Sequence, residues 1–205
     1  MPTPDAPTDE QLVEAFRRGE TGAYRTLVER YHDDLIRFLT RLVGDRTGAE
    51  DLFQETFLQV YQSADTFDVS RRFRPWLFTI AANKGRDHLR RKGRRKTVEL
   101  SAPVGGGGSG GERNASFVDL MEVDVPAPGE GLDRSERDRM VQEALQELQP
   151  ALREILLLAY FQRLSYARIA EDLGIPLGTV KSRLHAAVAA FARQWQIKTR
   201  DMRDE

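Results

Sequence analysis

The chain has 205 residues and carries 31 lysines and arginines against 32 aspartates and glutamates, a net charge of −1 that favours no class of partner. It contains no cysteine, which excludes disulfides, thiolate zinc sites, iron–sulfur clusters and a cysteine nucleophile. The longest apolar run, residues 155–161, is too short to cross a bilayer, and the acidic start MPTPDAPTDE has no signal-peptide core. We therefore expect a cytoplasmic protein without membrane insertion, built as one large or two small domains.

Residues 8–96 have the apolar periodicity of helices, with no strand-like alternation. The expected helices are, in chain order, Glu10–Arg18 closed by Gly19, Ala23–Val43, a helix opened by a capping box of Thr47 with Glu50 and carrying Leu52, Phe53, Phe57, Val60 and Tyr61, and a helix from about Arg74 and Pro75. These helices are expected to pack as one domain.

The third of these helices carries a mixed acidic, amide and apolar face. Asp51, Gln54, Glu55 and Leu58 are three or four residues apart, so they share one side of the helix. Such a face suits docking on a basic partner, and the alternative is a solvated helix surface.

The fourth helix ends in a strongly basic tail. Residues 84–96, KGRDHLRRKGRRK, hold eight lysines and arginines and one acid. Contacts with phosphates would make binding strongly salt-dependent. The alternative is a solvated basic helix end, which the helix dipole also favours.

Aromatic residues alternate with arginines before and within the start of this helix. Phe67, Phe73, Trp76 and Phe78 surround Arg71, Arg72 and Arg74. Aromatic rings stack on unpaired bases, at roughly 1–3 kcal/mol each. Helical spacing cannot bring all four rings onto one buried stripe, although core packing remains the alternative for Trp76 and Phe78. Asn83, two turns after Trp76, could read a base edge.

Residues 97–132 differ in composition from the rest of the chain. They contain GGGGSGG and PAPGEG, an excess of acidic residues and few large apolar side chains, so we expect a flexible linker. The short segment FVDLMEV, residues 117–123, could dock on a partner or be an isolated apolar patch.

Residues 133–197 are expected to form four helices that end in a helix-turn-helix. One helix runs to Leu148 and a second from Pro150 to Phe161. Ser165 can cap the third, Gly174 stops it, and a fourth begins near Gly178 or Thr179. Val180, Leu184, Ala187 and Phe191 would face inward on that fourth helix, which leaves a polar outer face of Thr179, Lys181, Ser182, Arg183 and His185. A polar helix of this kind fits the DNA major groove, and the alternative is an ordinary helical hairpin.

The sequence offers little for catalysis. Glu29 and His32 form a single E-x-x-H pair, whereas a di-iron bundle needs two such pairs with further glutamates. The glycine-rich run lacks the G-K-[ST] ending of a phosphate loop. We therefore expect no enzyme activity, no catalytic residues, no cofactor and no metal.

Three motifs together resemble the extracytoplasmic-function (ECF) sigma factors, group 4 of the sigma-70 family. They are AEDLFQETFLQVY, FRPWLFTIAANKGRDHLRR and LSYARIAEDLGIPLGTVKSRL. The resemblance implies an all-α fold with a sigma-2-like bundle in 8–96, a flexible acidic linker in 97–132 and a sigma-4-like helix-turn-helix domain in 133–197. It also implies a promoter-specificity subunit of RNA polymerase that acts in transcription initiation.

The resemblance further implies a role for each surface. Asp51, Gln54, Glu55 and Leu58 would dock on the clamp helices of the beta-prime subunit, and the beta flap would be a second contact. The −10 element would be bound by Arg71, Arg72, Phe73, Trp76, Asn83, Lys84, Arg86, Arg90 and Arg91. The −35 element would be bound by Thr179, Lys181, Ser182, Arg183 and His185. An anti-sigma factor is an expected further partner.

Two departures from the family pattern are visible. After R-L the last helix reads HAAVAAFAR where the family usually has more arginines, which predicts a weaker or shifted backbone grip at −35. The glycine run is also longer than is typical. The alternative function is a free-standing helix-turn-helix regulator, and the third is a metalloenzyme bundle around Glu29 and His32.

Overall fold

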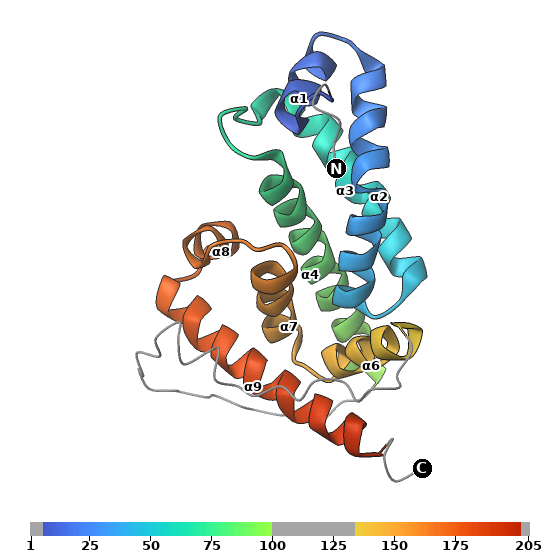
Figure 1. The fold of residues 1–205 in the computed structure, drawn as a ribbon, viewed down its shortest axis with the longest axis vertical. Helices are drawn as coiled ribbons and strands as arrows, with labels where there is room; N and C mark the ends of the chain where they lie inside the picture. Colours follow the sequence, from blue (N-terminus) through green and yellow to red (C-terminus); the bar gives the residue numbers. More distant parts are fainter. Residues whose placement is uncertain (1–5, 100–133, 202–205) are drawn as a thin grey trace. The chain divides into compact units, whose positions relative to one another are not determined.

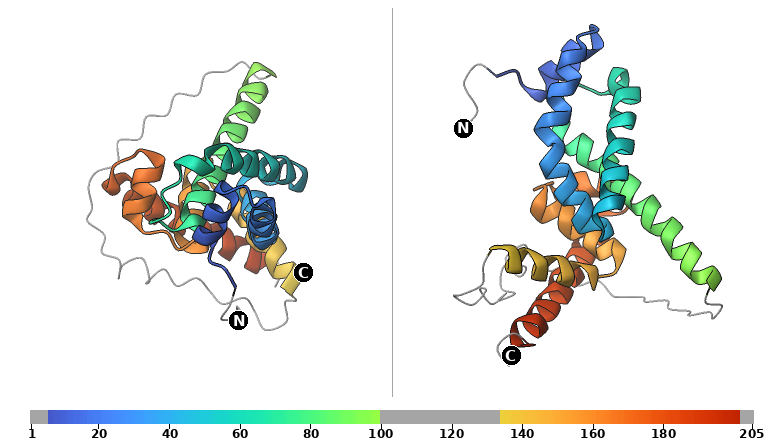
Figure 2. Two further views of the ribbon diagram at one scale, coloured as in Figure 1. Left: turned by 90° about the horizontal axis from the view of Figure 1, so that it is seen from above. Right: turned by 90° about the vertical axis from the view of Figure 1, so that its right-hand side faces the viewer.

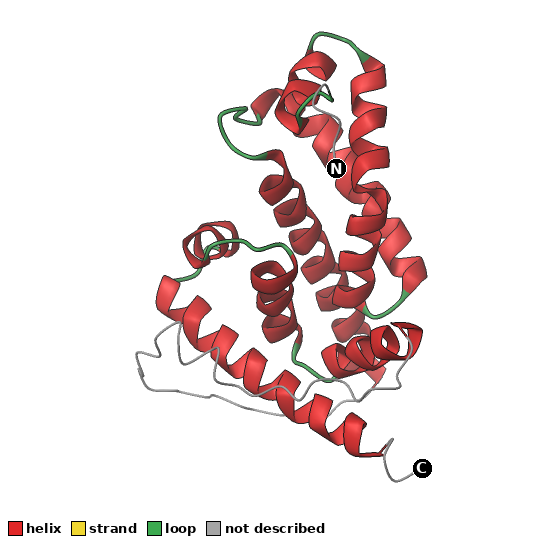
Figure 3. Ribbon diagram, viewed as in Figure 1, coloured by secondary structure: helices red, strands yellow, loops and turns green. Residues whose placement is uncertain are grey.

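Helices make up the fold in the computed structural model, which describes residues 6–99 and 134–201 (Figures 1 and 3). No strand occurs in these two ranges, so the expected all-α class is confirmed. The chain divides into two compact units, Met1–Asp87 and His88–Glu205. The predicted linker lies outside the described residues from residue 100 onward, as does the whole 117–123 segment.

The first unit is formed by α1 (Asp9–Arg17), α2 (Thr21–Val43), α3 (Arg46–Ser63), the 3-10 turn η1 (Ala64–Thr66) and the first part of α4 (Phe73–Glu99). Helix α2 packs against α1 and α3, as Figure 2 shows for α2 in blue and α3 in cyan. The largest fully buried side chains of the first unit are Leu27, Leu35, Leu39, Leu42, Leu52, Phe73, Leu77 and Phe78.

Contacts and backbone conformations of neighbouring residues set the helix ends in this unit. Thr8 and Gln11 form a capping box at the start of α1, and Gly44 ends α2 in the left-handed conformation with φ of 92°. The predicted capping box of Thr47 with Glu50 is wrong. Asp45 caps α3 instead, because its carboxylate accepts the Gly48 N–H at 2.6 Å, while Glu50 pairs with Arg46 at 2.9 Å.

Helices α2 and α4 approach each other closely at Gly85. A Cβ atom placed on Gly85 would lie 2.4 Å from Cδ2 of Leu42, which is itself buried. Only a glycine leaves room for this contact. It fixes α4 along α2, and so positions the side chains that α4 exposes.

The second unit contains α6 (Arg134–Gln146), α7 (Pro150–Leu156), the π turn η2 (Leu157–Phe161), α8 (Tyr166–Leu173) and α9 (Leu177–Asp201). Helices α6, α7 and α8 all pack on α9. The predicted helical segment from Pro150 to Phe161 is present, and its last five residues have the wider π-helical form. There the Gln162 N–H donates to the Leu157 carbonyl, five residues back, at 3.2 Å.

A buried arginine closes the turn between α6 and α7. The Arg153 guanidinium donates to the carbonyls of Gln146 at 2.9 Å and Leu148 at 3.1 Å, and to the Gln146 side chain at 2.5 Å. These carbonyls lie beyond the last hydrogen bonds of α6, so they need an outside donor. Burial lowers the pKa of Arg153 from its ordinary value, but these acceptors suit the charged form.

Candidate nucleic-acid interface

The helix-turn-helix is formed by α8 and the first half of α9. The Ser165 hydroxyl accepts the Arg168 N–H at 3.2 Å, as the sequence predicted. Gly174 ends α8 with φ of 62°, and the Gly174 and Ile175 N–H groups donate to the carbonyls of Glu171 and Ala170. Helix α9 begins at Leu177, one or two residues before the predicted start.

The buried side of α9 agrees with the sequence prediction. Val180, Leu184 and Ala187 are fully buried, while Phe191 is half-buried and stacks on Trp195 at 6.1 Å. On the other side, Lys181, Ser182 and His185 are exposed, and Thr179 and Arg183 are half-buried. This face offers charged, hydroxyl and imidazole groups, the kinds that bind phosphates and base edges in a major groove.

An aromatic cluster supports the loop between η1 and α4. Phe67 lies 4.7 Å from Trp76 and 5.9 Å from Phe73 between ring centroids, and Phe73 lies 5.8 Å from Trp76. Phe67, Phe73 and Phe78 are buried, and Trp76 is half-buried. Phe73 was expected on the −10 surface, but its side chain has no exposed area and so cannot stack on a base. The assignment of Phe73 to the −10 surface is therefore corrected: its ring supports the loop.

Residues 68–72 of this loop, all exposed except the half-buried Val69, are ordered by Asp68. The Asp68 carboxylate accepts the Ser70 hydroxyl at 2.7 Å and the Ser70 N–H at 3.0 Å, and lies 3.6 Å from the Arg71 guanidinium. The Ser70 hydrogen bonds hold the pKa of Asp68 below its ordinary value of 3.8. Arg71 and Arg72 are exposed on this loop.

Helix α4 presents the remaining predicted −10 residues. Asn83, Arg86, Arg90 and Arg91 are exposed, and Lys84 is half-buried with its ammonium 3.9 Å from Glu55. The Arg86 guanidinium donates to the Asn83 amide oxygen at 3.1 Å. The basic tail continues in α4 to Glu99, but the side chains of residues 94–99 lie outside the described part of the chain.

Arg74 stabilises the start of α4. Its guanidinium donates to Asp34 at 3.0 Å and lies over the rings of Phe78, at 4.9 Å, and Tyr31, at 5.7 Å. Burial would raise the pKa of Asp34, but hydrogen bonds from Arg74 and Arg37 outweigh it and lower the pKa. Arg74 thus joins α4 to α2.

Sequence reasoning missed two residues of α1 at this loop. The Glu10 carboxylate accepts the Phe73 N–H at 2.9 Å, and Arg17 donates to the carbonyls of Ala64 and Phe67. Burial would raise the pKa of Glu10, but the hydrogen bond from Phe73 and the nearby Arg72 charge help to outweigh it, so the pKa is lowered. No spacing rule connects residues so far apart, so no sequence signal could have found them.

The predicted docking face lies open on α3. Asp51, Gln54 and Leu58 are exposed and Glu55 is half-buried; Leu58 is 57% exposed. Tyr61, predicted among the apolar residues of this helix, is also 57% exposed, one turn beyond Leu58. One side of its ring still packs on Phe16 at 5.2 Å, so the phenol extends the exposed face.

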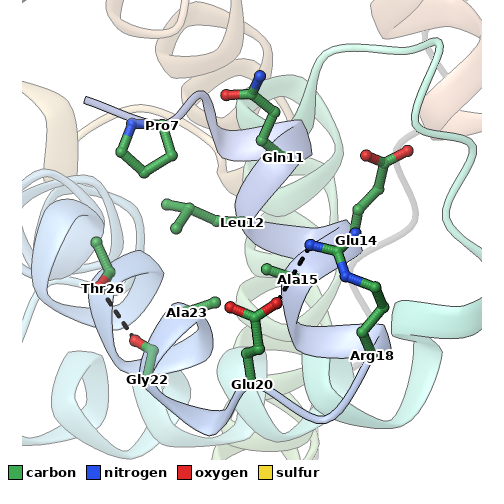
Figure 4. Close-up of a pocket in the computed structure, with 10 residues that line it drawn as sticks. All are labelled: Pro7, Gln11, Leu12, Glu14, Ala15, Arg18, Glu20, Gly22, Ala23 and Thr26. Atoms are coloured by element: carbon green, nitrogen blue, oxygen red, sulfur yellow. Dashed lines mark hydrogen bonds and ion pairs between the residues drawn. The ribbon is translucent and has the colours of Figure 1, made fainter. Parts of the chain in front are cut away.

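A shallow cleft lies between α1 and the start of α2 (Figure 4). Its floor is apolar, with Leu12 and Ala23, and its rim carries the Arg18–Glu20 ion pair at 3.2 Å.

Glu29 and His32 are exposed on α2, and no group of three or more His, Cys, Asp or Glu side chains in 6–99 and 134–201 could hold a metal ion. Among the helices that the structure describes, none has the length and apolar character to cross a membrane.

Comparison with known proteins identifies the family. Residues 27–95 match the model of Sigma-70 region 2, and residues 138–191 match that of Sigma-70, region 4. The chain is 30% identical to the ECF RNA polymerase sigma factor SigW of Bacillus subtilis over 182 residues, 89% of this chain and 94% of SigW. The chain belongs to the ECF sigma factors.

A second sequence relative supports the same family, and a solved structure has a similar fold. The chain is 38% identical to the ECF RNA polymerase sigma factor SigL of Mycobacterium tuberculosis over 180 residues, 87% of this chain and 92% of SigL. Its fold resembles the sigma factor RpoE of Bartonella quintana, solved with the anti-sigma factor NepR, with a TM-score of 0.60 and 22% identity over 85% of this chain and 97% of RpoE. The region 2 match begins at residue 27, so α1 lies outside it.

Proposed function

We propose that this chain is a promoter-specificity subunit that binds core RNA polymerase and directs transcription initiation through −35 and −10 elements. The observation that carries the proposal is the presence of both sigma-70 regions in one chain. Each region has an exposed polar face on a rigid helix. A free-standing regulator would need only the second region, so the region 2 match favours the sigma function.

The two regions would divide the work. In the region 133–197, the outer face of α9 would read the −35 duplex through Thr179, Lys181, Ser182, Arg183 and His185. In the region 8–96, the loop before α4 and the exposed face of α4 would bind the −10 element. The set there is Arg71, Arg72, Trp76, Asn83, Lys84, Arg86, Arg90 and Arg91. Residues 97–132 join the two regions in sequence.

Helix α3 would dock on the polymerase. Its exposed Asp51, Gln54 and Leu58, with half-buried Glu55, combine negative charge with an apolar centre. That combination suits a basic helical surface such as the beta-prime clamp helices, because buried apolar area supplies affinity and charge supplies orientation. The beta flap would be a second contact.

The same surfaces would be the target of an inhibitor. RpoE of Bartonella quintana was solved in complex with an anti-sigma factor. We infer that an anti-sigma factor also binds this chain, that the chain acts in the cytoplasm beside polymerase, and that it has no catalytic activity of its own.

Reconstituted transcription tests the proposal. Purified core polymerase should transcribe a cognate promoter only when this chain is added. Arg183→Ala should lower promoter use and leave polymerase binding intact, whereas Asp51→Arg should weaken polymerase binding first. Arg193→Ala and Asp33→Arg, at exposed positions on α9 and α2, are matched controls and should change neither. Failure to bind core polymerase, or tight duplex binding without it, would contradict the proposal.

A further inference from the structure

Helix α1 contacts both ends of the loop that precedes α4. The chain leaves η1 at Thr66, runs through Phe67 and the mostly exposed residues 68–72, and enters α4 at Phe73. Figure 1 shows α1 beside the segment that leads into α4. Both contacts are hydrogen bonds from charged side chains to the backbone, so they act on the path of the chain itself.

The entry end is held by Arg17. Its Nε donates to the Ala64 carbonyl at 2.8 Å, and Nη2 donates to the Phe67 carbonyl. One guanidinium thus joins two carbonyls that lie three residues apart on either side of the end of η1. A planar guanidinium with several fixed donors can do this in one orientation.

The exit end is held by Glu10. Its carboxylate accepts the Phe73 N–H at 2.9 Å. Phe73 opens α4, so Arg72 stands at the N-cap position, and an arginine side chain has no acceptor for a helix N–H. Glu10 therefore supplies from α1 the cap that the chain lacks locally.

The two contacts come from one face of α1. Glu10 and Arg17 are seven residues apart, about two helical turns, so they lie on the same side of the helix. Their charges also match the groups they meet, since the anion faces the positive end of α4 and the cation faces the backbone carbonyls of Ala64 and Phe67 at the end of η1. The spacing of Glu10 and Arg17 along α1 therefore fixes the separation of the two loop ends.

We propose that α1 positions the −10 reading loop, with Glu10 and Arg17 as positioning residues that set how residues 68–72 meet the promoter. This rests on the proposed function. Neither residue need touch DNA. They hold the loop ends apart at a fixed distance, and Asp68 and Ser70 then order the exposed part between them.

Four variants with two matched controls test the proposal. Glu10→Ala removes the acceptor, and Glu10→Gln restores an uncharged one; Arg17→Met removes the donors, and Arg17→Lys restores some of them. The matched controls are Glu14→Ala, one turn after Glu10, and Arg18→Met, one residue after Arg17. Both residues are exposed. Circular dichroism and thermal unfolding establish that each variant is folded.

The deciding measurement is a ratio of transcription rates. Core polymerase with each variant transcribes the cognate promoter, a version substituted in the −10 element, and a version substituted in the −35 element. Discrimination against the −10 substitution should fall about tenfold for Glu10→Ala and Arg17→Met. This is the factor expected from the loss of one hydrogen bond to a charged group. Glu10→Gln and Arg17→Lys should recover part of it. Discrimination against the −35 substitution should not change.

A second measurement separates this proposal from the proposed function. Hydrogen exchange of the Phe73 amide in the free protein should accelerate in Glu10→Ala and stay unchanged in Glu14→Ala. If exchange accelerates but −10 discrimination stays at the wild-type ratio, α1 does not position the loop for reading and the inference is overturned. An equal loss at −10 and −35 also overturns it, because that pattern indicates a general structural defect. Wild-type protein that directs no promoter-specific transcription contradicts the proposed function instead.

Discussion

Each unit of the molecule closes a chain turn with an arginine that donates to backbone carbonyls, but the two arginines act over different sequence distances. Arg153 reaches the carbonyls of Gln146 and Leu148, seven and five residues away. Arg17 reaches those of Ala64 and Phe67, 47 and 50 residues away. The turn between α6 and α7 is thus closed by a neighbouring residue, whereas the proposed −10 loop depends on a helix far from it in sequence. Substitutions of the two arginines should therefore affect the two units differently.

Replacing Arg153 with methionine should have the largest effect, and it should fall on the second unit. The change removes the donor from two backbone carbonyls, one in a buried and one in a part-buried hydrogen bond, which costs about 3 kcal/mol in the free energy of unfolding. Urea denaturation measures the loss. Arg139→Met is the control, because Arg139 is exposed and its carboxylate partner Glu143 is 3.8 Å away, so a change under about 0.5 kcal/mol is expected. Equal effects of the two variants would remove Arg153 from this role.

Gly85→Val should destabilise the first unit by about 2 kcal/mol. The added side chain meets the buried Leu42 and forces α2 and α4 apart, which is an overpacking cost. Gly93→Val is the matched control on α4, where an added Cβ atom has no neighbour within 4 Å. Thermal unfolding of both variants gives the comparison. A stable Gly85→Val protein would mean that the helices can separate without loss.

Gly174→Ala tests the local turn of the helix-turn-helix and should cost about 1 kcal/mol. Nothing lies within 4 Å of the added Cβ atom, so the cost comes from the left-handed backbone alone, at φ of 62°. Gly178→Ala, in α9 and also in open space, should be neutral or slightly stabilising. Chemical denaturation that ranks the two variants in the opposite order would contradict this account of the turn.

Acid should weaken the first unit through Glu10 and Asp34, with the smallest effect of the four. Both carboxyls have a lowered pKa in the folded protein, so their contribution to stability is fully present above the ordinary values of 4.5 and 3.8 and is lost as the pH falls through the lowered values. The free energy of unfolding between pH 6 and pH 3 should fall less steeply in a Glu10→Gln, Asp34→Asn double variant than in the wild type. Parallel curves would exclude these two carboxyls as the cause.

The same contrast explains what could be predicted from the sequence. The Ser165 cap, the Gly174 stop and the buried side of α9 were predictable because each depends on neighbours within one or two helical turns. The Glu10 cap of α4 was not, because its partner is 63 residues away. At α3 the prediction placed the cap on Thr47, whereas the Asp45 carboxylate two residues earlier accepts the Gly48 N–H at 2.6 Å.

Core packing had been left open as an alternative for Phe78, but the burial of Phe67 and Phe73 was missed for a different reason. The argument from spacing assumed that α4 has one buried stripe. In the structure Phe78 packs on Phe38 of α2 at 5.2 Å, while Phe73 packs on Phe67 before the loop. A helix that is covered on more than one side buries rings from several faces, and periodicity alone does not reveal the second cover.

The length of α9 has a mechanical consequence. Its first turns carry Lys181 and His185 at the proposed reading end, and its far end packs on α6, where Trp195 is buried and Lys198 pairs with Glu143 at 3.1 Å. Its 25 residues form one uninterrupted rod about 37 Å long. A tilt of about 10° about one end therefore displaces the other by about 6 Å. A change in how α6 packs on α9 would therefore also change the angle at which the other end of α9 enters a DNA groove.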